Sequence, residues 1–217
     1  MNRLPLLLLS LLTAACQSQP DRPTEPAVPA ASSVPTAPKR DTASPVVPSE
    51  GLVTLALADS AVQLVNAETG STTKIPLGRP FEPLVRTVTN VLGEPPARVG
   101  VNGECGAGPL KMATWANGLT LAFREQDRGD ASSGREWQFA GWSLNPGRGA
   151  GRAPATMAGV GRGTTRAEVE SAYVIKVVQS SLGHEFSTAS GLYGLFDGAG
   201  PQARVSALWS GTSCVFR

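Results

Sequence analysis

The sequence predicts an α+β domain of two tandem repeats, each a helix followed by an antiparallel sheet (α-β-β-β), preceded by a disordered linker. A proline-rich segment ends near residue 50. Beyond it, apolar residues mostly alternate with the period of strands. Two segments instead have helical spacing, and each is followed by further strand patterns. A single repeat would leave one sheet face bare, so we expect the two to pack together.

Residues 1–15 have the organisation of an export signal. Arg3 supplies a positive start, a leucine-rich run follows, and Thr13, Ala14 and Ala15 end the segment with small residues. The apolar run is shorter than the roughly 20 residues that a membrane-spanning helix needs. The segment therefore predicts export rather than a membrane span.

The end of this segment, Leu12-Thr13-Ala14-Ala15-Cys16, resembles the lipobox of bacterial lipoproteins. The resemblance implies that Cys16 receives a diacylglyceryl group, becomes the N-terminus and is acylated, typically with palmitate. Several acyl chains anchor a protein stably to a membrane. Gln17 follows in place of the Asp that marks inner-membrane retention, which implies a periplasm-facing outer-membrane anchor. The alternative is an ordinary cleaved signal with an incidental cysteine.

Residues 16–50 predict a disordered tether behind the lipidated cysteine. Positions 17–50 contain eight prolines and no aromatic residue. Such a composition buries too little apolar surface to fold, and its prolines keep it extended. The alternative to a dedicated spacer is a generic lipoprotein linker.

Residues 51–217 predict the folded part, with a first repeat and its N-terminal hairpin in 51–150 and a second repeat in 151–217. The 15 Lys and Arg and 13 Asp and Glu of this part nearly balance. No strong field therefore favours nucleic acid as a partner.

The first repeat contains a strong helix signal: Pro80 suits the first helical position, apolar residues from Phe81 to Leu92 have helical spacing, and Gly93 ends the helix. Asn117-Gly118 predicts the turn of a hairpin. The remaining patterns predict strands at 52–58, 62–65, 74–75, 112–115, 119–124 and 137–144.

The second repeat begins with a predicted capping box, in which Thr165 and Glu168 start a helix. Strand patterns follow at 175–178, 192–196, 205–209 and 214–216. Leu77-Gly78-Arg79 before the first helix parallels Val160-Gly161-Arg162 before the second.

The glycine-led turn Gly161-Arg162-Gly163 into a helix resembles the fold shared by BamE (SmpA) and the β-lactamase inhibitory protein. The stretch 104–110, Asn117-Gly118-Leu119 and the ending 205–217 are similar to an uncharacterised lipoprotein family. Some of its members are filed as aspartate-semialdehyde dehydrogenase. The string 159–163 lacks the G-x-G-x-x-G spacing and βαβ context of a dinucleotide site, so the residues argue against that activity.

Cys105 and Cys214 are the remaining cysteines once Cys16 is assigned to lipid. An even pair in an oxidising compartment predicts a disulfide. Two structural thiols or a metal pair are the alternatives, although a single histidine in the chain makes a poor zinc site.

A binding surface is expected from exposed aromatic and basic side chains. Trp137 and three further tryptophans either form a contact face or pack in the core. The basic residues either bind a headgroup or belong to a flexible connection between the repeats. The predicted surface comprises Trp115, Trp142, Trp209, Arg148, Arg152 and Arg162.

The chain's one histidine, His184, would serve a hydrolase only if a serine and an acid such as Glu185 met it in space. The sequence contains no nucleophile-elbow motif around Ser190-Gly191. We therefore expect a non-catalytic binding or scaffold module of the envelope, without cofactor or metal. Its expected contacts are the membrane, through the lipid, and an envelope protein, peptidoglycan or lipid partner. An envelope hydrolase and an inhibitor of an envelope enzyme are the alternatives.

Overall fold

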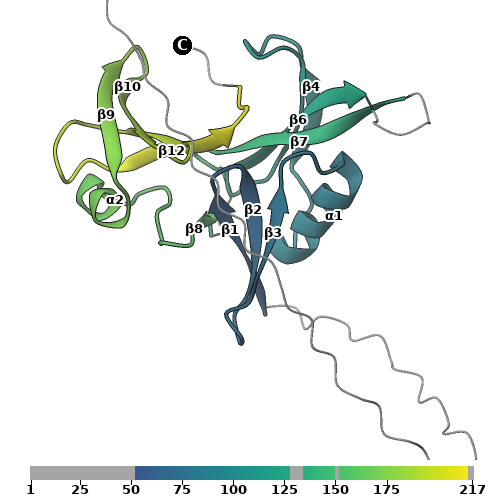
Figure 1. The fold of residues 1–217 in the computed structure, drawn as a ribbon, viewed down its shortest axis with the longest axis horizontal. Coiled ribbons are helices and arrows are strands. Elements are labelled where there is room, and N and C mark those ends of the chain that lie inside the picture. The colour runs from purple at the N-terminus through teal and green to yellow at the C-terminus, as the bar shows by residue number, and fades with distance from the viewer. Residues whose placement is uncertain (1–51, 128–133, 150–151, 215–217) are drawn as a thin grey trace, which may run out of the picture. The chain divides into compact units, whose positions relative to one another are not determined.

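A computed structural model describes residues 52–127, 134–149 and 152–214 (Figure 1). The predicted signal peptide, Cys16 and the tether lie outside these residues. The described part is mostly β, with two sheets and two helices. The α+β class is therefore observed, with strands dominating.

The chain order of the elements matches most of the predicted segments. The strands Arg98–Asn102 and Gly183–Thr188 and the short strand Ala155–Thr156 were not predicted, and Cys214 lies outside any strand. The elements are β1 (Val53–Ala58), β2 (Ala61–Asn66), β3 (Thr72–Pro76), α1 (Phe81–Leu92), β4 (Arg98–Asn102), β5 (Leu110–Thr114), β6 (Leu119–Asp127), β7 (Arg135–Leu144), β8 (Ala155–Thr156), α2 (Arg166–Ala172), β9 (Ile175–Ser180), β10 (Gly183–Thr188), β11 (Leu192–Phe196) and β12 (Val205–Gly211).

The larger sheet has eight strands in the order β4-β5-β6-β7-β12-β11-β10-β9. Two antiparallel meanders, β4 to β7 and β9 to β12, meet where β7 pairs with β12, with Leu144 opposite Leu208. Each helix is thus followed by a four-stranded meander of the large sheet, whereas the predicted unit has three strands. The additional strand is β4 in the first meander and β10 in the second. In the second repeat the strand expected at 214–216 does not include Cys214, and residues 215–216 lie outside the described residues.

The smaller sheet has the order β3-β2-β1-β8, and β8 joins β1 in parallel. It lies between α1 and α2, below the large sheet in the view of Figure 1. The Trp142 indole N–H donates to the Ala58 carbonyl at 2.8 Å, and the Ser60 N–H donates to the Ser210 hydroxyl at 3.0 Å. The first hairpin therefore contacts both meanders, although the sequence assigned it to the first repeat alone.

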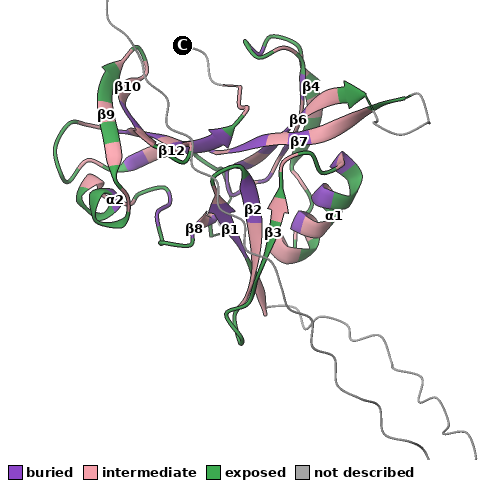
Figure 2. Ribbon diagram, viewed as in Figure 1, coloured by how far each residue is buried: buried purple, intermediate pink, exposed green. Residues whose placement is uncertain are grey.

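The main core lies between the large sheet and the layer formed by α1, the small sheet and α2 (Figure 2). Trp115 and Trp142 are fully buried there, and Trp209 is buried against Tyr193 with ring centroids 6.0 Å apart. The expected contact face of tryptophans is therefore wrong for these three residues. Trp142 and Trp209 lie on β7 and β12, and Trp115 directly follows β5; burying their large rings stabilises the fold.

α1 begins at Phe81, so Pro80 is its N-cap rather than its first residue, and α2 begins where the predicted capping box indicates. α1 ends at Gly93, which has the left-handed φ of 70° that favours glycine. In α2 the Thr165 hydroxyl accepts from the Glu168 N–H, while the Glu168 carboxylate accepts from the Thr165 N–H at 2.8 Å. The predicted capping box is therefore confirmed.

Cys105 and Cys214 form a disulfide with their Cα atoms 5.1 Å apart. It joins the loop after β4 to the segment after β12 and packs with Leu110 and Ala122 in a second, smaller cluster. This is the pair that the sequence predicts, and it links the first meander to the end of the second.

Candidate functional site

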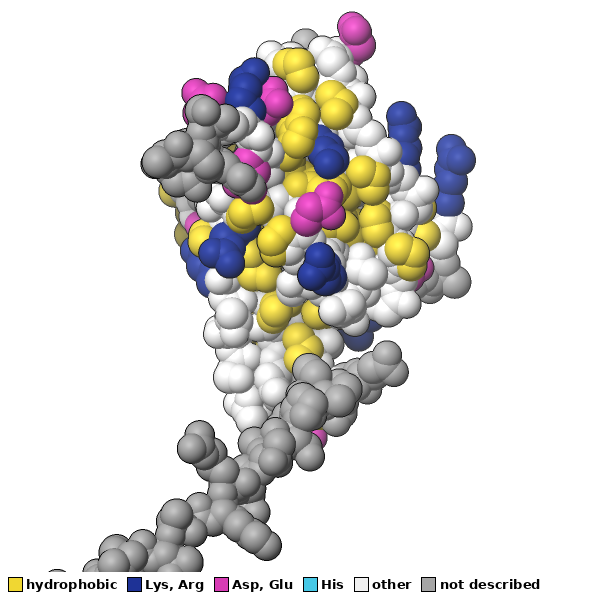
Figure 3. All heavy atoms as spheres, turned by 90° about the vertical axis from the view of Figure 1, so that its right-hand side faces the viewer, with side chains coloured by type: hydrophobic (Ala, Val, Ile, Leu, Met, Phe, Trp, Pro, Cys, Tyr) yellow, Lys and Arg dark blue, Asp and Glu magenta, His cyan; other side chains and the backbone are white. Residues whose placement is uncertain are grey.

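A groove of about 470 Å³ opens where the start of α1 faces β5 and the start of β7. We call it the α1 groove. Figure 3 shows this side of the molecule, with hydrophobic side chains gathered among basic and acidic ones. Its lining residues are Pro80, Phe81, Glu82, Pro83, Lys111, Arg135, Glu136 and Trp137.

The floor of the α1 groove is held by aromatic packing. The ring of Phe81 meets Phe123 edge-on, with centroids 4.7 Å apart, and Phe123 in turn packs against Phe139. The Lys111 ammonium lies 3.6 Å from the centroid of the Phe81 ring, within cation–π distance. The floor is thus a preformed aromatic surface with a cation fixed on it.

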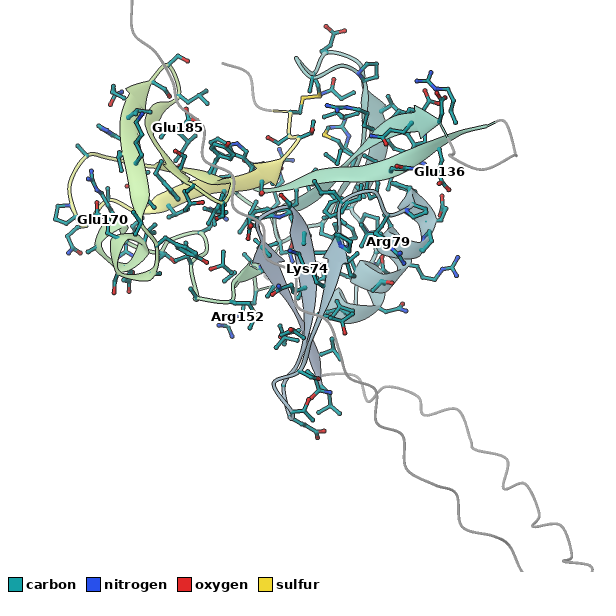
Figure 4. All side chains as sticks on the ribbon, in the orientation of Figure 1. Lys74, Arg79, Glu136, Arg152, Glu170 and Glu185 are labelled. Carbon is teal, nitrogen blue, oxygen red and sulfur yellow. A yellow bond between two sulfur atoms is a disulfide. The ribbon has the colours of Figure 1, made fainter. Side chains whose placement is uncertain are left out.

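The rim of the α1 groove carries exposed charges. Arg135 contacts Glu125 at 3.1 Å and Asp127 at 3.7 Å; the Arg135 and Asp127 side chains are largely solvent-accessible, and Glu125 is half-buried. Solvent-exposed ion pairs of this kind contribute little to stability. Glu136 follows Arg135 on β7 and also lines the groove (Figure 4). This combination of aromatic floor and mixed-charge rim suits protein contacts.

A second hollow, of about 510 Å³, lies between β1, the end of α1 and the segment that contains β8. We call it the β1 cleft. Its lining is mostly aliphatic, and it includes the exposed side chain of Met157. Arg152 is the charged residue among the lining residues, and Figure 4 labels it beside the small sheet.

The three arginines that the sequence grouped together are all exposed. Arg148 follows β7 and donates its backbone N–H to the Ala116 carbonyl, Arg152 lines the β1 cleft, and Arg162 lies in the turn before α2. That they form one basic binding surface stays a prediction.

His184 lies on β10 opposite Phe196 and Gln179. Glu185 follows it directly, and successive side chains of a strand point to opposite faces. The Ser180 hydroxyl is 3.5 Å from the Gly183 carbonyl and accepts from the Leu182 N–H. His184 is not among the lining residues of the α1 groove or the β1 cleft.

The main residues of the α1 groove, Phe81 and Lys111, were not predicted as site residues, and Trp137 was not part of the predicted surface. Phe81 was taken only as a helix residue, and nothing in the local pattern of Lys111 indicates that it stacks on an aromatic ring. The edge strand β4 was also missed, although the alternation of Val99-Gly100-Val101 with Arg98 and Asn102 is a short strand signal.

The glycine string between Gly159 and Gly163 forms the turn from β8 to α2. The Val160 N–H donates to the Thr156 hydroxyl, and the Gly163 N–H donates to the Val205 carbonyl. These backbone donors are used by the fold itself, in agreement with a structural role for the string.

Across residues 52–127, 134–149 and 152–214, no three His, Cys, Asp or Glu side chains are grouped so as to hold a metal ion. In the same described residues, no helix is long and apolar enough to cross a bilayer. Searches against protein-family models, curated proteins and solved structures found no match for this chain.

Proposed function

We propose that this protein is a non-catalytic binding module of the bacterial cell envelope that uses the α1 groove to hold a protein partner. The observation that carries the proposal is the aromatic floor of Phe81 and Trp137 with Lys111 stacked on it. Aromatic residues in a preformed concavity, with a polar rim, are typical of the centres of protein interfaces.

The proposed location is the periplasmic face of the outer membrane, with the lipid on Cys16 as anchor. The lipobox resemblance supports the anchor. The disulfide between Cys105 and Cys214 supports an oxidising compartment, because such bonds persist outside the reducing cytosol. The proline-rich segment 17–50 would place the domain at a distance from the bilayer.

The finer fold proposal is a tandem duplication. Its support is that each helix is followed by a four-stranded meander, and that the two meanders join through β7 and β12. Such a plan is compatible with the assembly-like or inhibitor-like role that the sequence resemblance implies. It leaves the α1 groove in the first unit, at the far end of the sheet from α2 (Figure 1).

The partner that suits the α1 groove is a polypeptide segment with an apolar side chain flanked by both charge signs. The apolar side chain would contact the half-buried Trp137 and the small exposed part of Phe81 beside Lys111. The rim offers a carboxylate at Glu82 and a guanidinium at Arg135, which would select flanking charges.

Site-specific photocrosslinking in living cells tests the groove. A photoreactive residue replaces Glu82, an exposed lining residue, and in the matched control it replaces Lys176, an exposed residue of β9. We expect a discrete envelope-protein adduct from position 82 that is lost when Lys111→Glu is added. Equal adducts from both positions, or adducts to lipid or glycan alone, would contradict a protein-binding groove.

Intact mass of the protein from envelope fractions tests the location. We expect a lipid-modified Cys16 and no alkylatable thiol until a reductant is added. An unlipidated chain with free thiols would refute the envelope proposal.

A further inference from the structure

The four sheet edges of the domain differ in how they are protected against pairing with another strand. An edge strand exposes unpaired backbone groups, and proteins usually protect it with charge, proline or short length. β3 carries Lys74 and Pro76, β8 has two residues, and β9 carries Lys176 at its second position. β4 has one charged residue, Arg98, at its start, followed by Val-Gly-Val-Asn. It is the least protected of the four edges.

Two rows of cross-strand neighbours that are buried in the large sheet continue onto β4, where the side chains are exposed. Val101 is opposite Lys111, which is opposite the buried Phe123. In the next row Val99 is opposite the buried Ala113. Yet the two valines are 57% and 48% exposed. Apolar side chains are thus placed in line with the core at a position where they remain in water.

The sequence of β4 is complementary to itself. If two copies pair antiparallel about Gly100, then Val99 of one copy lies opposite Val101 of the other. Arg98 then lies opposite Asn102, so like charges do not meet. The geometry points to β4 as a homodimer interface, which would join the large sheets of two copies edge to edge around a twofold axis. We propose this dimer independently of any partner of the α1 groove.

Gly100 supports a second copy as the occupant. Its φ lies outside the left-handed region, and a Cβ built there would meet none of the described heavy atoms within 4 Å. The backbone and packing of one copy therefore do not require glycine, which weakens a strand interior. At the twofold axis the residue faces its own counterpart, where the close approach of two backbones favours glycine.

The test is sedimentation equilibrium of the full chain in a density-matched detergent, over a series of concentrations. Three variants are compared with the wild type. In the proposed dimer, position 99 of each copy faces position 101 of the other, so Val99→Lys with Val101→Lys brings two positive charges together at both sites. Val99→Lys with Val101→Glu brings a positive and a negative charge together at the same two sites. Val178→Lys changes an exposed valine of the other edge, β9.

We expect dimers for the wild type, for the Lys/Glu variant and for Val178→Lys. The Lys/Lys variant should dimerise on the order of tenfold more weakly or not at all, because like charges directly opposite destabilise strand pairs. The Lys/Glu variant shares the change at position 99 and controls for folding. Its circular dichroism is recorded beside that of the Lys/Lys variant.

Three outcomes would overturn the dimer. A wild type that is monomeric at every concentration excludes it. A dimer that persists in the Lys/Lys variant places the interface elsewhere. Loss of dimer in both double variants excludes the antiparallel register about Gly100. None of these results depends on Cys16 lipidation or on a groove partner, so they leave the proposed function to its own tests.

Discussion

The two helices of this domain are held in different ways. α1 has 12 residues and buries Phe81, Leu84 and Val88, while its N-cap Pro80 offers no side-chain hydrogen-bonding group. α2 has seven residues, buries only Val169, and begins with a complete capping box. A helix long enough to present an apolar stripe is stabilised by packing, whereas a helix as short as α2 depends on contacts at its ends.

Further polar contacts surround α2. Arg166 pairs with Glu170 at 2.7 Å and donates to the Ala199 carbonyl at 2.9 Å. Arg204 donates to the Gly163 carbonyl at 2.7 Å, just before the helix. α2 therefore relies on polar contacts near the surface, and α1 relies on burial. Four predictions test this contrast.

Removal of the disulfide should have the largest effect, because it constrains both halves at once. We expect Cys105→Ser with Cys214→Ser to lower the free energy of unfolding by about 4 kcal/mol, since the bond closes a loop of about 110 residues in the unfolded chain. Urea unfolding measures the loss. A single transition that persists would show that β7–β12 pairing and the first hairpin couple the halves without the disulfide, whereas two transitions would show that the halves unfold separately.

Leu84→Ala in α1 should destabilise the domain by about 3 kcal/mol, because it removes a fully buried side chain and leaves a cavity. Val169→Ala in α2 removes a smaller buried side chain and should cost about half as much. Urea unfolding of the two variants compares them directly. A larger loss for Val169→Ala would break the proposed contrast between the helices.

Loss of the α2 cap should cost less than loss of the α1 stripe. Thr165→Ala removes the hydroxyl that accepts from the Glu168 N–H, and we expect a loss of about 1 kcal/mol in the free energy of unfolding. Thr165→Ser, which keeps the hydroxyl, is the matched control. If alanine and serine behave alike, the capping box does not support α2.

The smallest effect concerns pH. The hydrogen bonds from the Thr165 side chain and backbone N–H hold the pKa of the Glu168 carboxyl below its ordinary value. Because the folded pKa lies below the unfolded one, this contribution is fully present above the unfolded pKa and is lost as pH falls through the folded pKa. The stability difference between wild type and Glu168→Gln should therefore shrink on acidification.

Glu168→Gln in a Thr165→Ala background serves as the control for this pH dependence. That background lacks the hydroxyl whose hydrogen bond with Glu168 lowers the pKa of the carboxyl. We expect the stability difference in that background, measured by urea unfolding at each pH, to depend less on pH. An equal dependence in both backgrounds would assign the effect to general helix-end charge rather than to the capping box.

The sequence by itself determined those features that depend on neighbours along the chain. The helical spacing from Phe81, the stop at Gly93 and the reciprocal pair Thr165 and Glu168 all act within a few residues, so local chemistry predicts them. The turn at Asn117-Gly118 belongs to the same class. The disulfide between Cys105 and Cys214 was also predicted without knowledge of the fold, because an even pair of cysteines in an oxidising compartment favours a disulfide.

Only the tertiary structure decided which side chains are buried and which segments meet. Trp142 is buried because the first hairpin crosses beneath the large sheet, and its indole N–H is satisfied by Ala58 from that hairpin. The α1 groove combines residues from α1, β5 and β7 that lie far apart in the chain. β4 is an edge because its meander ends there, and that position leaves Val99 and Val101 exposed. Burial and exposure follow from strand order, which a local pattern does not contain.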